Sequence, residues 1–318
     1  MSQQLKSKKK KANFWSVSRG VGVATDQSSW KGKKVAMDMS FFVIRAFSGN
    51  LRVYGRKPHF RWIANAIEAL VRAGVTEVIA VFDGPAHALK AAKLGMSRRA
   101  KTFLQRHVES AKVLLDQLAI QYIDADHDAE AACASLNRQG MVHAVLTDDF
   151  DTFLYGGKNV YKGFRICRGV PKATSYRQED ILQTLRVSLY GLVVSAVLAG
   201  TDFNIGQMNV GPKKALEKVR QRLEPEFVSA VEATKFIFDN DMTFNGGIEA
   251  FHIFTADSES IDTKIFLQMR SREVTVWPAP LDIMIQTMMP HVGLTRATAI
   301  AETVWQYQRK RYPTRQNY

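Results

Sequence analysis

Seven carboxylates in the sequence have the residue types and the spacing of a divalent-metal site. Three of the apolar runs, at residues 34–37, 77–82 and 141–147, are followed directly or within two residues by an aspartate. Two more acids open the segment DHDAEAAC, and another ends the apolar segment LAGTD. The complete set is Asp38, Asp83, Asp128, Glu130, Asp149, Asp151 and Asp202.

Such a set of acids requires cations. Carboxylates that share one cleft repel each other, and burial raises their pKa values unless hard cations neutralise them. An all-oxygen ligand set favours Mg²⁺ or Mn²⁺ over Zn²⁺, and a pair of such ions activates water and stabilises the leaving oxygen of a phosphodiester. We expect two Mg²⁺ ions, with Mn²⁺ as a substitute. Taken alone, Asp128 and Glu130 also suit the first turn of a helix, where the dipole favours acids.

An alternation of strands and helices must position these acids. We expect a mostly parallel central sheet with helices on both faces, an α/β fold in which functional groups collect beyond the carboxyl ends of the strands. The acids that follow three of the strands would then meet at one edge of the sheet. The expected strands are 34–37, 77–82, 119–123 and 141–147, and the expected helices are 39–47, 62–72, 86–118 and 129–138.

The second half of the chain is mainly helical in pattern. Residues 158–171 are less regular, and an apolar helix over 181–199 leads to Asp202. After about residue 220 the pattern is helical except for an extended piece, EVTVW, before Pro278.

The charge of the chain favours a polyanionic partner. The formal net charge is +14 with a pI near 9.8, and nucleic acid is a better fit than an anionic membrane. Nine of these charges lie in two tails free of acids, 1–11 and 307–318. These tails are typical of disordered segments that increase solubility or of segments that bind nucleic acid. Residues 8–11 also resemble a nuclear localisation signal.

Neither a disulfide framework, nor a secreted protein, nor a membrane protein is indicated. Cys133 and Cys167 lie outside any CxxC or Cys/His cluster, which fits a reducing compartment. The N-terminus lacks an apolar core segment, and the most apolar stretch has 14 residues, too few to span a bilayer. We expect an intracellular protein without membrane contact, nuclear in a eukaryotic cell or host.

A glycine hairpin offers an anion site. In the segment NVGPKKA, Gly211 allows the turn, Pro212 suits a first helical turn, and the helix N-terminus attracts a backbone phosphate. Lys213 and Lys214 add positive charge. A plain connection between two helices is the alternative.

The segment LTDDFDTFLYG holds three aspartates that we expect to differ in role. In an extended chain Asp149 and Asp151 project to the same side, whereas Asp148 points away and becomes a turn or supporting residue. The aspartyl loop of haloacid dehalogenase-type phosphatases is an alternative for this segment. Phe153 stands where that family has Thr or Val, and the loop lies far from the N-terminus, so this alternative is the weakest.

With these segments the chain resembles the XPG/flap endonuclease family of structure-specific 5′ nucleases. The likeness extends from about residue 14 to about residue 306, and the matching segments occur in the order of the family. They are KKVAMDMS, AVFDGPA, DAEAACASL, LTDDFDTFLYG, LAGTDFN and NVGPKKAL.

The resemblance implies a PIN-like nuclease domain and roles for individual residues. The seven acids correspond to the ligands of two Mg²⁺ ions, and Lys90 and Arg98 to basic residues that contact the scissile phosphate. A helix-two-turn-helix region at about 190–222 would bind duplex DNA and hold a K⁺ ion. Its implied binding residues are Gly206, Val210, Gly211, Lys213 and Lys214.

Four departures from the family pattern modify these expectations. Asp128 replaces the usual Glu and is one methylene shorter, and the 45 positions from Asp83 to Asp128 leave a truncated helical arch. A basic extension replaces the family's N-terminal start, and the C-terminus shows no sliding-clamp peptide. A shortened arch relaxes the need for a free 5′ end, and the compact chain would suit a virus.

We therefore expect a Mg²⁺-dependent 5′ endonuclease or exonuclease acting on branched or nicked duplex DNA in replication, repair or recombination. The alternative from another class is a DNA-binding scaffold without catalysis. The expected organisation is a basic disordered extension at 1–11, a single domain at 12–306 with parts 12–157 and 158–306, and a basic tail at 307–318. The oligomeric state and the preferred DNA structure stay open.

Overall fold

The chain forms two compact units. The computed structural model describes residues 13–47, 58–90, 98–222, 229–239, 246–255, 264–265, 268 and 279–311, and for residues 98–103 and 222 it describes the backbone alone. The helical unit comprises Met1–Val21, Ala88–Gly95 and Glu179–Ala256, and the sheet unit comprises Gly22–His87, Met96–Gln178 and Asp257–Tyr318. Residues 159–177, which follow the predicted part 12–157, supply two strands of the sheet.

The sheet unit is built on seven strands in the order β1-β7-β6-β5-β2-β3-β4. The run from β6 to β4 is parallel, and β7 and β1 are added antiparallel at one end. The mostly parallel sheet predicted from sequence is confirmed. The strands are β1 (Val23–Ala24), β2 (Lys34–Asp38), β3 (Glu77–Phe82), β4 (Gln121–Asp124), β5 (Ala144–Leu146), β6 (Asn159–Cys167) and β7 (Val170–Arg177).

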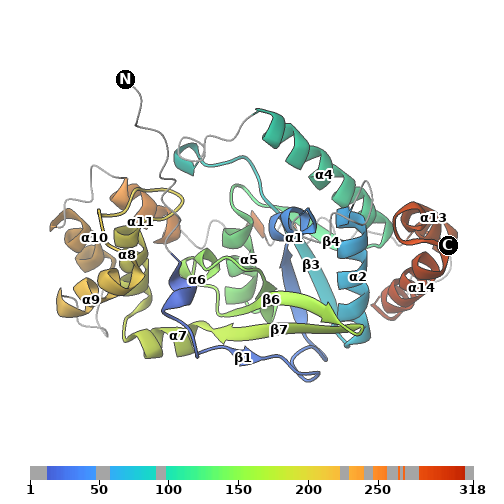
Figure 1. The fold of residues 1–318 in the computed structure, drawn as a ribbon, viewed down its shortest axis with the longest axis horizontal. Helices are drawn as coiled ribbons and strands as arrows, with labels where there is room; N and C mark the ends of the chain where they lie inside the picture. The colour runs from blue at the N-terminus through green and yellow to red at the C-terminus, as the bar shows by residue number, and fades with distance from the viewer. Residues whose placement is uncertain are drawn as a thin grey trace. The chain divides into compact units, whose positions relative to one another are not determined.

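Helices cover both faces of this sheet because its central strands are apolar on both sides. Along β2, Val35 and Met37 join one core cluster, whereas Ala36 joins the other. This alternation follows the two-residue period of a strand. The first cluster includes residues of α1 (Met39–Ala46), α2 (Pro58–Arg72), α4 (Arg98–Gln117), α13 (Leu281–Val292) and α14 (Leu294–Arg311), and the second includes residues of α5 (Ala129–Arg138), as Figure 1 illustrates.

The prediction of an irregular segment at 158–171 was wrong, since β6 and β7 form an antiparallel hairpin there. Arg168 and Gly169 form its two-residue turn, and both have positive φ angles, 52° and 78°. Such a turn matches the twist of the two strands. The register shifts between Lys162 and Arg165, around Gly163, which interrupts the simple alternation on which the prediction depended.

The apolar helix predicted over 181–199 is broken into α7 (Gln178–Leu185) and α8 (Leu189–Ala199). Arg186 takes a positive φ of 51°, and the hydroxyl of Ser188 then caps α8 by accepting the Gly191 N–H at 3.1 Å. The helical unit continues with α9 (Pro212–Arg222), α10 (Ala230–Asp239) and α11 (Gly247–Thr255). Among the described residues no single helix meets the length and apolarity needed to cross a membrane, whereas α7 and α8, bent by 73°, meet them when counted together.

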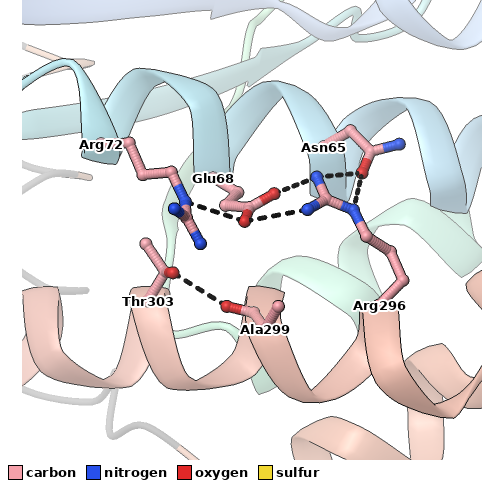
Figure 2. Close-up of polar contacts among 6 residues, drawn as sticks. All are labelled: Asn65, Glu68, Arg72, Arg296, Ala299 and Thr303. Carbon is pink, nitrogen blue, oxygen red and sulfur yellow. Dashed lines mark hydrogen bonds and ion pairs between the residues drawn. The ribbon is translucent and has the colours of Figure 1, made fainter. Parts of the chain in front are cut away.

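A polar network joins α2 to α14 within the sheet unit. Figure 2 shows the buried Glu68 carboxylate of α2 between Arg72 and Arg296, and Arg296 also donates to Asn65. Helix α14 continues to Arg311, so the first five residues of the predicted basic tail are helical. The predicted extension at 1–11, the rest of the tail and the segment EVTVW lie outside the described residues.

Candidate metal centre

Asp38 is fixed at the carboxyl end of β2 by two hydrogen bonds. Its Oδ1 accepts the Phe41 N–H at 3.1 Å, so the aspartate caps α1. Its Oδ2 accepts the hydroxyl of Thr147 at 2.8 Å. Because β2 and β5 pair in parallel, Thr147, one residue past β5, lies beside Asp38. The structure thus joins the ends of two strands at one acid, as the sheet topology predicted.

Asp83 follows β3 and is held by the beginning of α5. Its Oδ1 accepts the backbone N–H of Ala129, the first residue of that helix, at 2.7 Å. A carboxylate at a helix N-terminus is stabilised by the free N–H groups and the dipole. The Asp83 side chain is therefore turned towards the segment that carries Asp128 and Glu130.

Asp83, Asp128 and Glu130 form the core of the candidate centre. Each offers one carboxylate oxygen, and the three oxygens lie within 4.8 Å of one another. Asp128 is the N-cap residue of α5, yet its side chain makes no capping hydrogen bond. Its Oδ2 instead accepts the hydroxyl of Tyr155 at 3.1 Å. Capping of α5 therefore does not explain the position of the Asp128 carboxylate.

The segment after β5 sorts its three aspartates into two roles. Thr147 accepts the Asp149 N–H at 3.0 Å, and Asp149 accepts the Asp151 N–H at 3.0 Å. Asp148 instead accepts the Gly163 N–H at 2.6 Å and faces Arg45 at 3.3 Å. Asp148 thus has other partners than Asp149 and Asp151, whereas the roles predicted for the three aspartates stay predictions. The reason given for their difference was wrong. The chain is not extended there, because Asp151 begins α6 (Asp151–Leu154).

The pKa values record the crowding of negative charge. Burial, followed by repulsion from Asp83 and to a smaller extent from Asp149, raises the pKa of Asp38 to about 7 despite the hydrogen bonds it accepts. Burial and the charges of Asp128, Asp151 and Glu130 raise the pKa of Tyr155 well above its ordinary value. The Tyr155 hydroxyl therefore keeps its proton and acts as a donor.

These residues fit hard divalent cations. Carboxylate oxygens are the donors that Mg²⁺ accepts, and three of them already face one another closely enough to share an ion. The pKa of Asp38 is raised first by burial of its carboxylate and then by repulsion from Asp83 and Asp149. A bound cation would remove this repulsion and return Asp38 to its ionised form.

Asp202 and Lys90 are brought together in the helical unit. Asp202 follows α8, and its Oδ2 lies 3.8 Å from the Lys90 Nζ, which also lies over the ring of Phe203 at 6.0 Å. Both side chains are partly buried, with 23% and 17% of their surface exposed. Asp202 as a seventh ligand stays a prediction. The side chain of Arg98 lies outside the described residues.

The glycine hairpin has the predicted form of a turn followed by a helix. Pro212 is the first residue of α9, and Gly211, Lys213 and Lys214 are exposed. Gly206 lies so close to the end of α8 that a Cβ there would come within 2.3 Å of the Ala199 carbonyl carbon. Gly206 therefore serves close packing of the backbone.

The loop between the two helices is held by several hydrogen bonds. Gln207 donates its N–H to Leu198 O at 2.8 Å, and its side chain accepts the Lys218 Nζ at 2.8 Å. Asn204 donates to Val197 O at 2.9 Å. The hairpin is thus fixed to α8 and α9, while its lysines stay accessible.

Sequence reasoning missed two residues of the metal centre, Thr147 and Tyr155. Both are buried and each donates a hydroxyl to one of the predicted acids. Their positions next to LTDDFD were visible, but the orientation of a hydroxyl depends on which strand or helix lies beside it. A hydroxyl residue directly after an apolar strand would have been the available signal for Thr147.

Comparisons with known proteins give one match with defined bounds, which includes Asp128, Glu130, Asp149, Asp151 and Asp202. Residues 119–202 match the family model "XPG I-region". The chain is 35% identical over 137 residues to "Flap endonuclease 1" of Methanococcus aeolicus, covering 42% of this chain and 41% of that protein. It is 32% identical over 206 residues to human "Flap endonuclease GEN homolog 1", covering 59% of this chain and 22% of that protein. The matches thus span under half of these relatives.

Solved structures share the fold. The catalytic core of Rad2 in complex with a DNA substrate superposes with a TM-score of 0.69 at 23% identity, covering 92% of this chain and 98% of that chain. Human GEN1 in complex with Holliday junction DNA gives a TM-score of 0.72 at 21% identity, covering 96% of this chain and 81% of that chain.

Proposed function

Because the chain belongs to the XPG/flap endonuclease family, we propose that it is a Mg²⁺-dependent structure-specific nuclease that hydrolyses DNA phosphodiesters where duplex and single strand meet. The observation that carries this proposal is the carboxylate cluster at the carboxyl ends of the parallel strands. Asp83, Asp128 and Glu130 present three oxygens to a common point, and Asp38 lies within electrostatic range of Asp83.

Six acids of the sheet unit would hold the ions, and Asp202 is proposed as a further ligand from its place in the sequence alone. Two bound divalent cations supply a lowered pKa for an attacking water and charge stabilisation for the leaving oxygen. Hydrogen bonds from neighbouring residues fix the orientation of two of these acids. Thr147 links Asp38 to the Asp149 backbone, and Ala129 orients Asp83. The ligand set comprises Asp38, Asp83, Asp128, Glu130, Asp149 and Asp151, and Mn²⁺ would substitute for Mg²⁺.

Lys90 would hold the scissile phosphate. Its ammonium lies beside Asp202 and over Phe203, so a metal ligand and a phosphate-binding cation come from neighbouring positions of one unit. An ammonium held in this way is pre-positioned, and charge stabilisation by fixed groups is the largest contribution to many hydrolytic reactions. Arg98 at the start of α4 is proposed as a second phosphate contact from its place in the sequence.

The hairpin between α8 and α9 would bind the duplex. The N-terminus of α9 and the exposed Lys213 and Lys214 together favour a backbone phosphate. This contact is independent of base sequence, which suits an enzyme that recognises DNA by its shape. The loop carbonyls between Gly206 and Gly211 are proposed to hold a K⁺ ion, which would supply positive charge for a backbone phosphate.

The short connection between Asp83 and Asp128 affects which DNA ends the protein would accept. Forty-five positions separate these two acids, and α4 accounts for 20 residues of the connection. A connection of this length would enclose a threaded single strand less completely than a long arch. We therefore propose that a free 5′ end is not required, which allows cleavage of gaps, nicks and junctions as well as flaps.

A side-by-side cleavage panel tests the proposal. The substrates are a 5′ flap with a free end, the same flap with its end blocked by streptavidin, a gapped duplex and a four-way junction, each with Mg²⁺ or with EDTA. We expect Mg²⁺-dependent cleavage of both flaps, with loss of cleavage but not of DNA binding in Asp83→Ala. DNA binding without cleavage in the unmodified protein would show a scaffold instead. Strict inhibition by the block would refute the inference about the arch.

A further inference from the structure

The contact between Tyr155 and Asp128 assigns a task to a tyrosine that no sequence pattern marked. The Tyr155 hydroxyl donates to Asp128 Oδ2 at 3.1 Å, and the two residues are 8% and 7% exposed. A buried, charge-assisted hydrogen bond of this kind is stronger than one between neutral groups. This bond gives one oxygen of the Asp128 carboxylate a fixed partner.

Asp128 has an alternative partner close by. It occupies the N-cap position of α5 with extended backbone angles, φ −91° and ψ 131°, and an aspartate there ordinarily turns its carboxylate onto the free N–H groups of the first helical turn. In this chain the side chain makes no such bond. The Asp128 carboxylate therefore accepts the hydroxyl of Tyr155 through Oδ2 and does not cap α5.

The tyrosine is itself held firmly. Its N–H donates to Asp151 O at 3.0 Å, and its carbonyl oxygen accepts from Arg138 of α5. The Arg138 guanidinium thus connects the residue that follows α6 to α5, the helix for which Asp128 is the N-cap residue. A tyrosine whose backbone is held in this way can hold the short Asp128 side chain in one orientation.

We propose that Tyr155 is a positioning residue of the metal centre, whose hydroxyl keeps Asp128 off the helix cap and within reach of an ion shared with Asp83 and Glu130. The proposal rests on the proposed metal-dependent function.

Isothermal titration of Mg²⁺ or Mn²⁺ into the full chain without DNA tests this proposal apart from catalysis. Supporting groups of this kind typically change metal affinity 10- to 100-fold. We expect Tyr155→Phe to weaken binding about tenfold while thermal unfolding in EDTA remains cooperative. Tyr161→Phe is the matched control, since Tyr161 is equally buried and donates its hydroxyl at 3.1 Å to the Ser29 carbonyl. The control should bind as the unmodified chain does.

A double substitution separates positioning from a general structural effect. In Asp128→Asn the ligand charge is already removed, so adding Tyr155→Phe should cause little further loss, whereas independent effects would multiply. A Tyr155→Phe affinity within twofold of the unmodified chain would overturn the proposal and leave the proposed function intact. Absence of Mg²⁺ and Mn²⁺ binding by the unmodified chain would defeat both.

Discussion

Exchanging Asp148 and Asp149 separately for asparagine probes the division of roles after β5. Asp148→Asn keeps a side-chain oxygen that can accept the Gly163 N–H, and it removes only the charge that faces Arg45 at 3.3 Å. Arg45 and Asp148 are 32% and 37% exposed, so solvent screens their attraction. Such pairs contribute about 0.5 kcal/mol. Even if the whole amount were transmitted to the metal centre, activity would fall only about two- to threefold.

Asp149→Asn should behave differently because Asp149 adds to the repulsion that raises the pKa of Asp38. Its carboxylate therefore lies within the negative field that the cations would neutralise. Groups that merely support a ligand are worth 10- to 100-fold, and a proposed ligand should cost at least about 100-fold, or about 3 kcal/mol. The two substitutions, one position apart, should thus differ by a factor of roughly 40.

The assay is single-turnover cleavage of a labelled 5′ flap over a range of Mg²⁺ concentrations. Asp148→Asn should retain the Mg²⁺ dependence of the unmodified chain, and Asp149→Asn should remain inactive or respond only to much higher Mg²⁺. Arg45→Gln is the control for the ion pair and should resemble Asp148→Asn. Equal losses in the two aspartate variants would refute the assignment of roles.

Three further outcomes follow from other parts of the structure. In EDTA, Asp38→Asn should raise the melting temperature at pH 8 and not near pH 4. The pKa of Asp38 is about 7 in the native state, above its value in the unfolded chain, so the Asp38 carboxyl lowers the stability of the protein increasingly as the pH rises from the unfolded pKa to the native pKa. Arg296→Met should lower the free energy of unfolding in urea by about 2 kcal/mol, since it leaves the buried Glu68 with Arg72 alone; a loss no larger than that of the exposed Lys310→Met would contradict this. Lys213→Gln and Lys214→Gln should each reduce by about one the slope of log affinity for duplex DNA against log salt, measured in EDTA; unchanged slopes would exclude phosphate contacts.

The elements that failed prediction show where local pattern is insufficient. The hairpin of β6 and β7 carries a bulge at Gly163 and packs at the antiparallel end of the sheet, so its burial does not alternate simply. The break between α7 and α8 lies inside the segment predicted as one apolar helix and involves Arg186, in a left-handed conformation, followed by the Ser188 cap. A single residue of positive φ leaves no periodic trace in a sequence, whereas a strand or helix repeats its signal over several residues.

The sequence by itself determined the acids, their order and the strands that carry them. Apolar runs that end in aspartate are a local property, and parallel pairing brings the carboxyl ends of such strands to one edge. The tertiary structure decided how each acid is turned. Whether Asp128 caps α5 or meets Tyr155, and whether Asp148 or Asp149 turns towards Arg45, depends on groups 27 to 103 residues away. Hydrogen bonds reach only about 3 Å, so these choices exist only once the chain has folded.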